Sequence, residues 1–291
     1  MKKSYEIDMC HGPLLGKILL FSIPLMLSSI LQLLFNAADI IVVGRFTGSQ
    51  ALAAVGSTSA LINLLINIFV GLSVGVNVLV GKYYGARQDK NISETVHTAM
   101  LTSLLSGLAL VVLGLTAAKP MLRLMGTPDD VLDQAILYMR IYFLGMPVVM
   151  IYNFGAAILR AVGDTRRPLY YLFAAGVVNV ILNLTFVVGF GRGVDGVAWA
   201  TVISEHISAF FIVKSLMEAP GPLKLELKKL RIVPGKLKRI LKVGLPAGIQ
   251  GAVFSVSNVV IQSSVNSFGS VAMAGNTASS NIENFVYTAM N

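Results

Sequence analysis

The sequence predicts an all-α membrane protein: a polytopic helical bundle with about eight transmembrane helices of an expected twelve, arranged as two parallel-repeat lobes with the second incomplete. An apolar composition, eight apolar runs of spanning length and an internal repeat predict this fold class. Of the 291 residues, 55% are hydrophobic and 13% are charged, whereas a soluble globular chain carries about 25% charged residues. We therefore expect lipid to be the solvent for most of the chain.

The apolar runs are separated by short polar segments. A spanning helix needs about 20 mostly apolar residues, and such runs lie near 14–44, 51–80, 96–117, 133–159, 168–190, 196–217, 239–265 and 272–291. The N-terminal segment has no small-residue cleavage site after a short apolar region. We therefore expect the first run to be a retained helix rather than a signal peptide.

The basic residues predict the orientation of these spans. With the N-terminus inside, 18 Lys and Arg residues lie on the inner side and five on the outer side. Cationic loops stay in the cytoplasm, so we expect a cytoplasmic N-terminus and a multi-pass protein of the plasma (inner) membrane. The same loops account for the net charge of +9. A nucleic-acid partner is not expected, because it would require the basic residues on one soluble face.

Residues of the first two runs recur in the last two runs. They recur at an offset of 222 and then of 221, as in Pro24 with Pro246, Asn36 with Asn258, Gly48 with Gly269, and Ser59 with Ser280. An even number of spans per repeat gives both copies the same orientation, as in transporters built from two parallel halves. The pattern predicts an N-terminal six-helix lobe (1–218), a basic cytoplasmic linker (219–238) and the first two helices of a C-terminal lobe (239–291).

The second copy stops at Asn291, inside its second helix. A half-formed repeat would leave packing faces without their neighbours, so we interpret the chain as C-terminally truncated and expect the full-length protein to be a monomer. A natural eight-span protein is the alternative. An enzyme is not expected, and neither is a cofactor, because the three histidines are scattered without the spacing of a metal motif.

Asp39 and Glu205 are the two clear acidic residues inside apolar runs, whereas Glu283 in the last run is expected to be interfacial. An ionised carboxylate at membrane depth costs several kcal/mol, so such residues are functional candidates. Asp39, Asn183 and Thr201 all lie about 8–10 Å below the outer ends of their helices, at a rise of 1.5 Å per residue. Asn179 precedes Asn183 by four residues and shares its helix face. Together the four side chains offer oxygen ligands for Na⁺, whereas Asp39 alone could carry H⁺.

Several strings resemble those of the multidrug and toxic compound extrusion (MATE) family. They are IPLMLSSILQLLFNAADIIVVGRFTGSQALAAVG, GKYYGAR, AILRAVGDTRRP, NVILNLTFVVGFGRGVDGVAWATVIS and GLPAGIQ, and they follow the family's order along nearly the whole chain. The resemblance implies twelve spans in two lobes. It also implies a secondary antiporter that exports amphipathic or cationic small molecules by alternating access, in exchange for Na⁺ or H⁺.

The resemblance also bears on the ion site. Some MATE members have their coupling site in the N-terminal lobe. The resemblance to those members implies that Asp39, Asn179, Asn183 and Thr201 form the site in this chain. The position of Asn183 is often an aspartate in the family, so this chain has one carboxylate fewer and the choice between Na⁺ and H⁺ stays open. Interhelical hydrogen bonding for packing alone is the alternative role of the two amides and the threonine.

Other residues carry weaker expectations. Glu205 lies one turn deeper than Thr201, where it could be a second proton site, a contact for a cationic substrate or a partner of His206. Pro24, Pro147 and Pro246 interrupt helices and are candidate hinges, although such prolines are also tolerated structurally. We expect His97 to be solvated.

A flippase for lipid-linked precursors is the second functional hypothesis, because such proteins resemble MATE transporters in fold. A flippase would need an arginine-rich cavity to bind the phosphates of its cargo. The middles of the spans, however, contain almost no arginine. The expected partners are therefore small-molecule substrates and membrane lipids.

Overall fold

The structure is a computed structural model that describes residues 14–290, with side chains placed for 15–283. Every regular element in this part of the chain is helical, which confirms the predicted all-α fold class. The elements are α1 (Leu14–Phe46), α2 (Ser49–Gly85), α3 (Asp89–Leu124), α4 (Asp129–Leu144), α5 (Met146–Ala161), α6 (Arg166–Asn183), the π-helix η1 (Leu184–Gly189), α7 (Val194–Met217), the short 3-10 helices η2 (Gly221–Leu223) and η3 (Leu227–Lys229), α8 (Pro234–Asn266) and α9 (Ser270–Met290).

Six of these helices are long and apolar enough to cross a membrane: α1, α2, α3, α6 with η1, α7 and α8. Helices α4 and α5 together form a seventh candidate span, bent by 49°. Helix α9 occupies the eighth predicted run, but it does not meet the same measure over its described residues. Its sequence is rich in serine and asparagine, several of which line a cavity described below. Six or seven of the eight predicted spans therefore correspond to helices that could cross a membrane.

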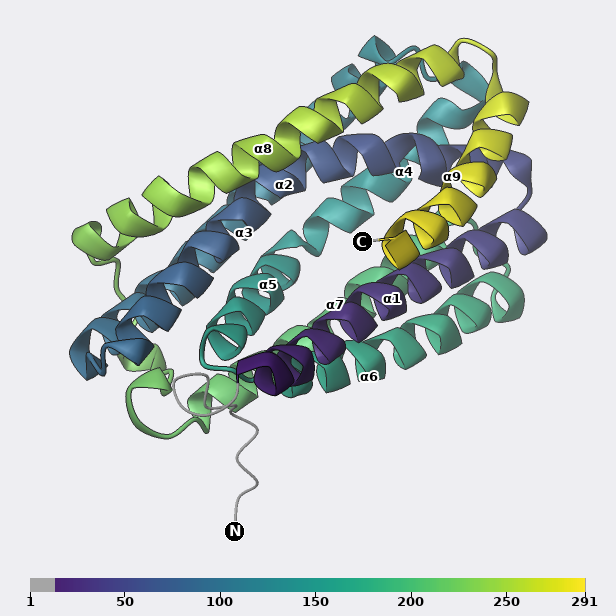
Figure 1. The fold of residues 1–291 in the computed structure, drawn as a ribbon. Coiled ribbons are helices and arrows are strands. Elements are labelled where there is room, and N and C mark those ends of the chain that lie inside the picture. Colours follow the sequence, from purple (N-terminus) through teal and green to yellow (C-terminus); the bar gives the residue numbers. More distant parts are fainter. Residues whose placement is uncertain (1–13, 291) are drawn as a thin grey trace.

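Successive spans run in opposite directions along one bundle, and α4 and α5 continue one another in the same direction (Figure 1). Helices α1, α3, α6 and α8 start at the end of the bundle where the segment between α7 and α8 lies; we call this the linker end and the opposite one the far end. Helices α1 and α8 run in the same direction, and so do α2 and α9 (Figure 1). This arrangement is the one expected for two parallel copies of a repeat.

The turns between the first and second helices of the two copies each contain a glycine with positive φ. Gly48, between α1 and α2, has φ 97°, and Gly269, between α8 and α9, has φ 86°. Side chains disfavour positive φ, so glycine is the residue suited to both positions. Gly56 and Thr277, also 221 residues apart, lie in contact: a Cβ on Gly56 would be 1.7 Å from Thr277 Oγ1. The two copies therefore meet between α2 and α9 at equivalent positions.

Helices α2 and α8 share the most extensive contact between any two elements. In their linker-end halves the contact is formed by glycines on both helices. A Cβ on Gly71 would lie 2.2 Å from the Gly248 Cα, and one on Gly75 would lie 2.3 Å from the Ile240 carbonyl oxygen. A Cβ on Gly244 would lie 2.6 Å from the Leu72 Cα. We call Gly71, Gly75, Gly244 and Gly248 the glycine seam, because backbone packs directly on backbone there.

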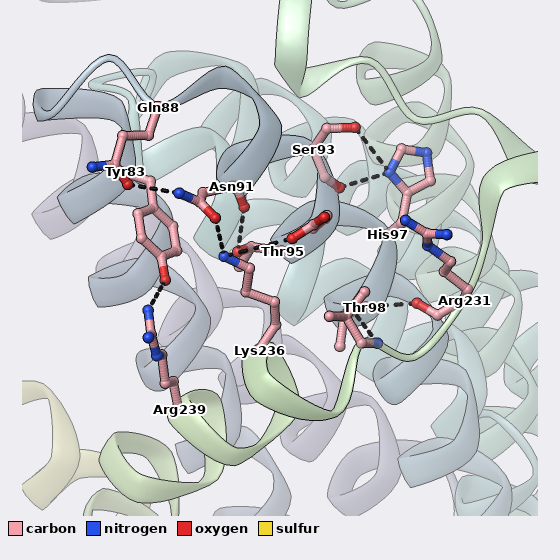
Figure 2. A network of polar contacts seen from close by, with 12 residues as sticks. Tyr83, Gln88, Asn91, Ser93, Thr95, His97, Thr98, Arg231, Lys236 and Arg239 are labelled. Carbon is pink, nitrogen blue, oxygen red and sulfur yellow. Dashed lines mark hydrogen bonds and ion pairs between the residues drawn. The ribbon is translucent and has the colours of Figure 1, made fainter.

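The segment between α7 and α8 is fastened to the start of α3 (Figure 2). Thr98 Oγ1 donates a hydrogen bond to the Arg231 carbonyl at 3.3 Å and accepts one from the Val233 amide at 3.1 Å. His97 Nε2 accepts a hydrogen bond from the Glu226 amide at 3.1 Å. The expectation that His97 is solvated is therefore wrong: its side chain is 3% exposed because the linker segment covers it.

The first turns of α8 add a second group of contacts in Figure 2. Lys236 Nζ donates a hydrogen bond to Asn91 Oδ1 and lies 4.2 Å from the centroid of the Tyr83 ring. It also lies 3.7 Å from Glu94 Oε2, and Arg239 donates a hydrogen bond to the Tyr83 hydroxyl. Helix α8 thus starts at Pro234, inside the range predicted as linker. Proline suits the first helical turn, because its missing N–H has no partner to lose there.

We expect Thr98→Val to loosen the linker segment. Valine keeps the shape of threonine but removes both hydrogen bonds to the linker backbone, at a cost of about 1 kcal/mol for each lost bond. Hydrogen exchange at the Val233 amide should accelerate, and trypsin should cut faster after Arg231. Thr116→Val is the control on the same helix, because the Thr116 hydroxyl bonds only to the carbonyl groups of Val112 and Leu113 in its own helix. Equal exchange in the two variants would contradict this prediction.

Candidate functional site

A cavity of about 360 Å³ lies among α1, α2, α4, α5, α6 and α7. We call it the acid cavity, because both intramembrane acids, Asp39 and Glu205, line it. Asn179 and Thr201 line it as well. Asn183 lies behind Asp39 and is fully buried. The structure thus brings every residue proposed from the sequence for ion coupling to one place.

Four of these side chains form a continuous series of hydrogen bonds. Asn183 Nδ2 donates to Asp39 Oδ1 and also to Asn179 Oδ1, the latter at 3.1 Å. Asn179 Nδ2 donates to Thr201 Oγ1 at 3.5 Å, and the Thr201 hydroxyl donates to the Val197 carbonyl of its own helix at 3.1 Å. Three helices, α1, α6 and α7, are therefore joined through one carboxylate, two amides and one hydroxyl.

The Asn183 amide is oriented by its two acceptors. Because its NH₂ group donates to both Asp39 and Asn179, its own oxygen has no hydrogen-bond partner among the described residues, although it is buried. A buried carbonyl oxygen without a partner costs about 1–3 kcal/mol. The Asp39 carboxylate and the Asn183 oxygen are both hard oxygen ligands, although the NH₂ group of Asn183, not its oxygen, is the part that faces Asp39. The group therefore contains ligand types that a small cation accepts.

The backbone of α6 changes its hydrogen-bonding pattern immediately after this site. The α-helix ends at Asn183 and continues as the π-helix Leu184–Gly189. The Phe190 amide donates to the Thr185 carbonyl five residues earlier, at 3.0 Å. π-Helical turns are uncommon and are frequent at functional sites. Nothing in the one-dimensional sequence pattern indicated this turn.

Glu205 lies on the wall of the acid cavity and accepts a hydrogen bond from the Ser208 hydroxyl at 3.1 Å. The alternative that it pairs with His206 is not seen: the exposed His206 ring bonds instead to the Val202 carbonyl at 2.7 Å. Glu205 therefore faces the same cavity as Asp39 without a basic partner among the described side chains.

The three candidate hinge prolines have different surroundings. Pro147 is the second residue of α5, just after the bend between α4 and α5. A Cβ on Gly107 of α3 would be 2.3 Å from the Pro147 Cα. Pro24 and Pro246 lie inside the continuous helices α1 and α8. Next to Pro24, the Ser28 hydroxyl bonds to the Pro24 carbonyl at 2.8 Å. A hinge role for all three stays a prediction.

One wall of the acid cavity is aromatic. Tyr138 and Tyr142 of α4 line it together with Tyr152 of α5, and the rings of Tyr138 and Tyr142 stack with centroids 6.1 Å apart. The four-residue spacing of two tyrosines in an apolar run was the available signal, because residues four apart share a helix face.

A second, larger cavity adjoins the first. It has a volume of about 680 Å³ and lies between α1, α2, α8 and α9, in the far-end half of the bundle. Gln32, Asn36 and Asn63 line both cavities, so the two spaces meet at these residues. The sequence interpretation did not predict this cavity, because the relevant amides lie on helices far apart in the chain.

The chain matches a known family along most of its length. The MatE family model matches residues 24–185. Probable multidrug resistance protein YoeA of Bacillus subtilis (strain 168) is 33% identical over 262 residues, which are 88% of this chain and 57% of that protein. Probable multidrug resistance protein YpnP of the same strain is 29% identical over 283 residues, 92% of this chain and 60% of that protein. The chain thus spans somewhat over half the length of these curated relatives.

Solved structures give the same result. The chain superposes on an inward-facing multidrug resistance MATE family transporter of the MOP superfamily with a TM-score of 0.79 and 28% identity, over 85% of this chain and 56% of that one. An outward-facing conformation of such a transporter matches with a TM-score of 0.78 and 25% identity, over 98% of this chain and 68% of that one. The chain therefore belongs to the MatE family of multidrug and toxic compound extrusion (MATE) transporters.

Proposed function

We propose that the chain supplies the ion-coupling lobe of a two-lobe secondary antiporter that exports small amphipathic or cationic compounds by alternating access. In this proposal residues 1–218 form the N-terminal lobe, 219–238 the linker and 239–291 the start of the C-terminal lobe. The observation that carries it is the hydrogen-bonded group of Asp39, Asn183, Asn179 and Thr201 on the acid cavity. A carboxylate held in a membrane bundle by amides rather than by a basic residue is suited to binding and releasing a cation.

The names of the related proteins support export as the activity. YoeA and YpnP are described as probable multidrug resistance proteins, and MepA of Staphylococcus saprophyticus, 22% identical, is described as a multidrug export protein. The two MATE structures reported above are inward- and outward-facing, which is the pair of states that alternating access requires.

Between the two ions, we propose H⁺ as the coupling ion. The group has one carboxylate, on Asp39, and its other oxygen ligands are neutral. A site binds Na⁺ more tightly when it has a second carboxylate, whereas a proton needs only one titrating group. We further propose that the linker end, where Lys224, Lys228, Lys229 and Arg231 lie, faces the cytoplasm, following the positive-inside rule.

The flippase hypothesis is the less favoured alternative. Its cargo carries phosphates, which proteins bind with arginine. No arginine lines either the acid cavity or the larger cavity beside it.

The test is gradient-driven uptake of ethidium into inside-out vesicles containing the complete two-lobe protein. We expect an acidic lumen to drive accumulation at equal Na⁺ on both sides, because protons leaving the lumen exchange for substrate. A Na⁺-filled lumen at equal pH should leave accumulation at the level of protein-free vesicles. Accumulation driven by the Na⁺ gradient alone would show that the coupling ion is Na⁺ and not H⁺. If neither gradient drove accumulation of ethidium or of a fluoroquinolone, the proposed export function would be rejected.

A further inference from the structure

The larger cavity between α1, α2, α8 and α9 is lined by carboxamide side chains from all four helices. Gln32 and Asn36 lie on α1, Asn63 on α2, Asn258 on α8 and Asn276 on α9. We call this space the amide cavity. Its volume of about 680 Å³ is within the range of small-molecule sites.

These five amides have no hydrogen-bond partner among the described residues. Two further amides of the same wall differ from them: Gln262 donates to Asn266 at 2.9 Å, and Asn281 donates to the Thr277 carbonyl at 2.8 Å. A carboxamide has two N–H donors and a carbonyl acceptor. Each of the five amides therefore has donors and an acceptor that no described protein group occupies.

The wall of the amide cavity lacks the groups that bind flat organic cations. Among residues 15–283, whose side chains the structure describes, no aromatic residue lines it, and its only charged lining residue is Glu283. Organic cations are held by aromatic faces and carboxylates, and most drug sites are lined largely by apolar and aromatic side chains. The hydroxyl groups of Ser29, Ser59 and Ser280 add instead to its hydrogen-bonding surface.

We propose that the amide cavity binds the polar part of a neutral polyhydroxylated amphiphile, such as a glycoside, as cargo. A hydroxyl group can donate one hydrogen bond and accept two, so it can pair with both the N–H and the C=O of a carboxamide. The inference rests on the proposed export function and adds a neutral class to the substrates proposed there. The acid cavity then binds the coupling ion and the amide cavity this neutral cargo, and the two sites share Gln32, Asn36 and Asn63.

The internal repeat supports a site shared between the two copies. Asn36 and Asn258 occupy equivalent positions 222 residues apart, and Ser59 and Ser280 are equivalent at an offset of 221. All four line the amide cavity. By contrast, the equivalent of Asp39 is Ile261, which also lines it. The repeat therefore places neutral hydrogen-bonding groups from both copies around the amide cavity, whereas the Asp39 carboxylate of the acid cavity has no acidic counterpart in the second copy.

The test is equilibrium binding of 4-methylumbelliferyl β-cellobioside, a neutral fluorescent glycoside, to the protein in detergent-free nanodiscs without an ion gradient. We expect saturable binding that Asn36→Leu and Asn258→Leu each weaken by about tenfold, the loss expected for one or two hydrogen bonds. Asn36→Ser and Asn258→Ser, which keep a polar group, should weaken it less. Gln250→Leu is the matched control, because Gln250 is an exposed amide of α8 that lines neither cavity.

Two results would overturn the proposal: no saturable binding of the glycoside, or binding that the Asn36 and Asn258 variants leave unchanged. Ethidium binding that depends on Asn36 and Asn258 more than glycoside binding does would also overturn it, in favour of a cationic cargo. Asp39→Asn separates this proposal from the export function. This variant should leave equilibrium binding of the glycoside unchanged. If it loses transport but still binds the glycoside, the loss is one of ion coupling and not of cargo binding.

Discussion

Replacing Asp39 with asparagine is expected to reduce proton-driven ethidium accumulation to the level of vesicles without protein. The substitution removes the carboxylate that would bind and release the ion. It preserves an oxygen at the same position, so Asn183 can still donate its hydrogen bond and the packing of α1 against α6 can persist. The measurement compares accumulation rates in vesicles at equal amounts of inserted protein.

Asp130→Asn is the control for this experiment. Asp130 is an exposed acid at the start of α4, and it accepts one long hydrogen bond of 3.4 Å from Gln50. The control removes the same charge outside both cavities and should transport like the parent. If Asp39→Asn retained gradient-driven accumulation, Asp39 would have only a packing role, and Glu205 would be the remaining acid on the same cavity.

Replacing Gly71 with alanine is expected to destabilise the bundle, although alanine is the better helix former. The added Cβ would lie 2.2 Å from backbone atoms of Gly248, so α2 and α8 must separate. Backbone atoms cannot change rotamer to make room, and overpacking of this kind typically costs about 1–3 kcal/mol. The midpoint of thermal unfolding in detergent should fall, and a larger residue at the same position should lower it further.

Gly275→Ala tests whether this effect is specific to the glycine seam. Gly275 lies inside α9, and a Cβ there would meet no heavy atom within 4 Å. The same substitution should therefore raise stability, by up to about 1 kcal/mol of helix propensity. Equal effects of the two substitutions on the unfolding midpoint would contradict direct backbone contact between α2 and α8.

Much of the candidate site was predictable because membrane burial makes polar residues conspicuous. Asp39 was identified because an ionised carboxylate inside an apolar run has a high free-energy cost. Counting residues from the helix ends predicted that Asn183 and Thr201 lie at the same depth in the membrane as Asp39. Depth and helix face are one-dimensional properties, so the sequence contains them. The hydrogen bonds that join Asp39, Asn183, Asn179 and Thr201 connect residues that this counting had grouped.

Other features were not predictable in this way, because they depend on which helices become neighbours. The glycine seam joins α2 to α8 across more than 160 residues, and a glycine in an apolar run does not show what it contacts. His97 was misjudged for a related reason: the linker segment that covers it lies 129 residues later in the chain, at Glu226. The amide cavity likewise combines residues from both copies of the repeat.

The glycine seam also limits how the bundle can change shape. A contact between two backbones contains no side chains that could be compressed or repacked, so α8 can roll or slide on α2 but cannot move closer to it. The seam lies in the linker-end halves of α2 and α8, whereas the far-end halves of the same helices line the amide cavity. Rolling or sliding at the seam would therefore change the spacing of α2 and α8 where they line that cavity.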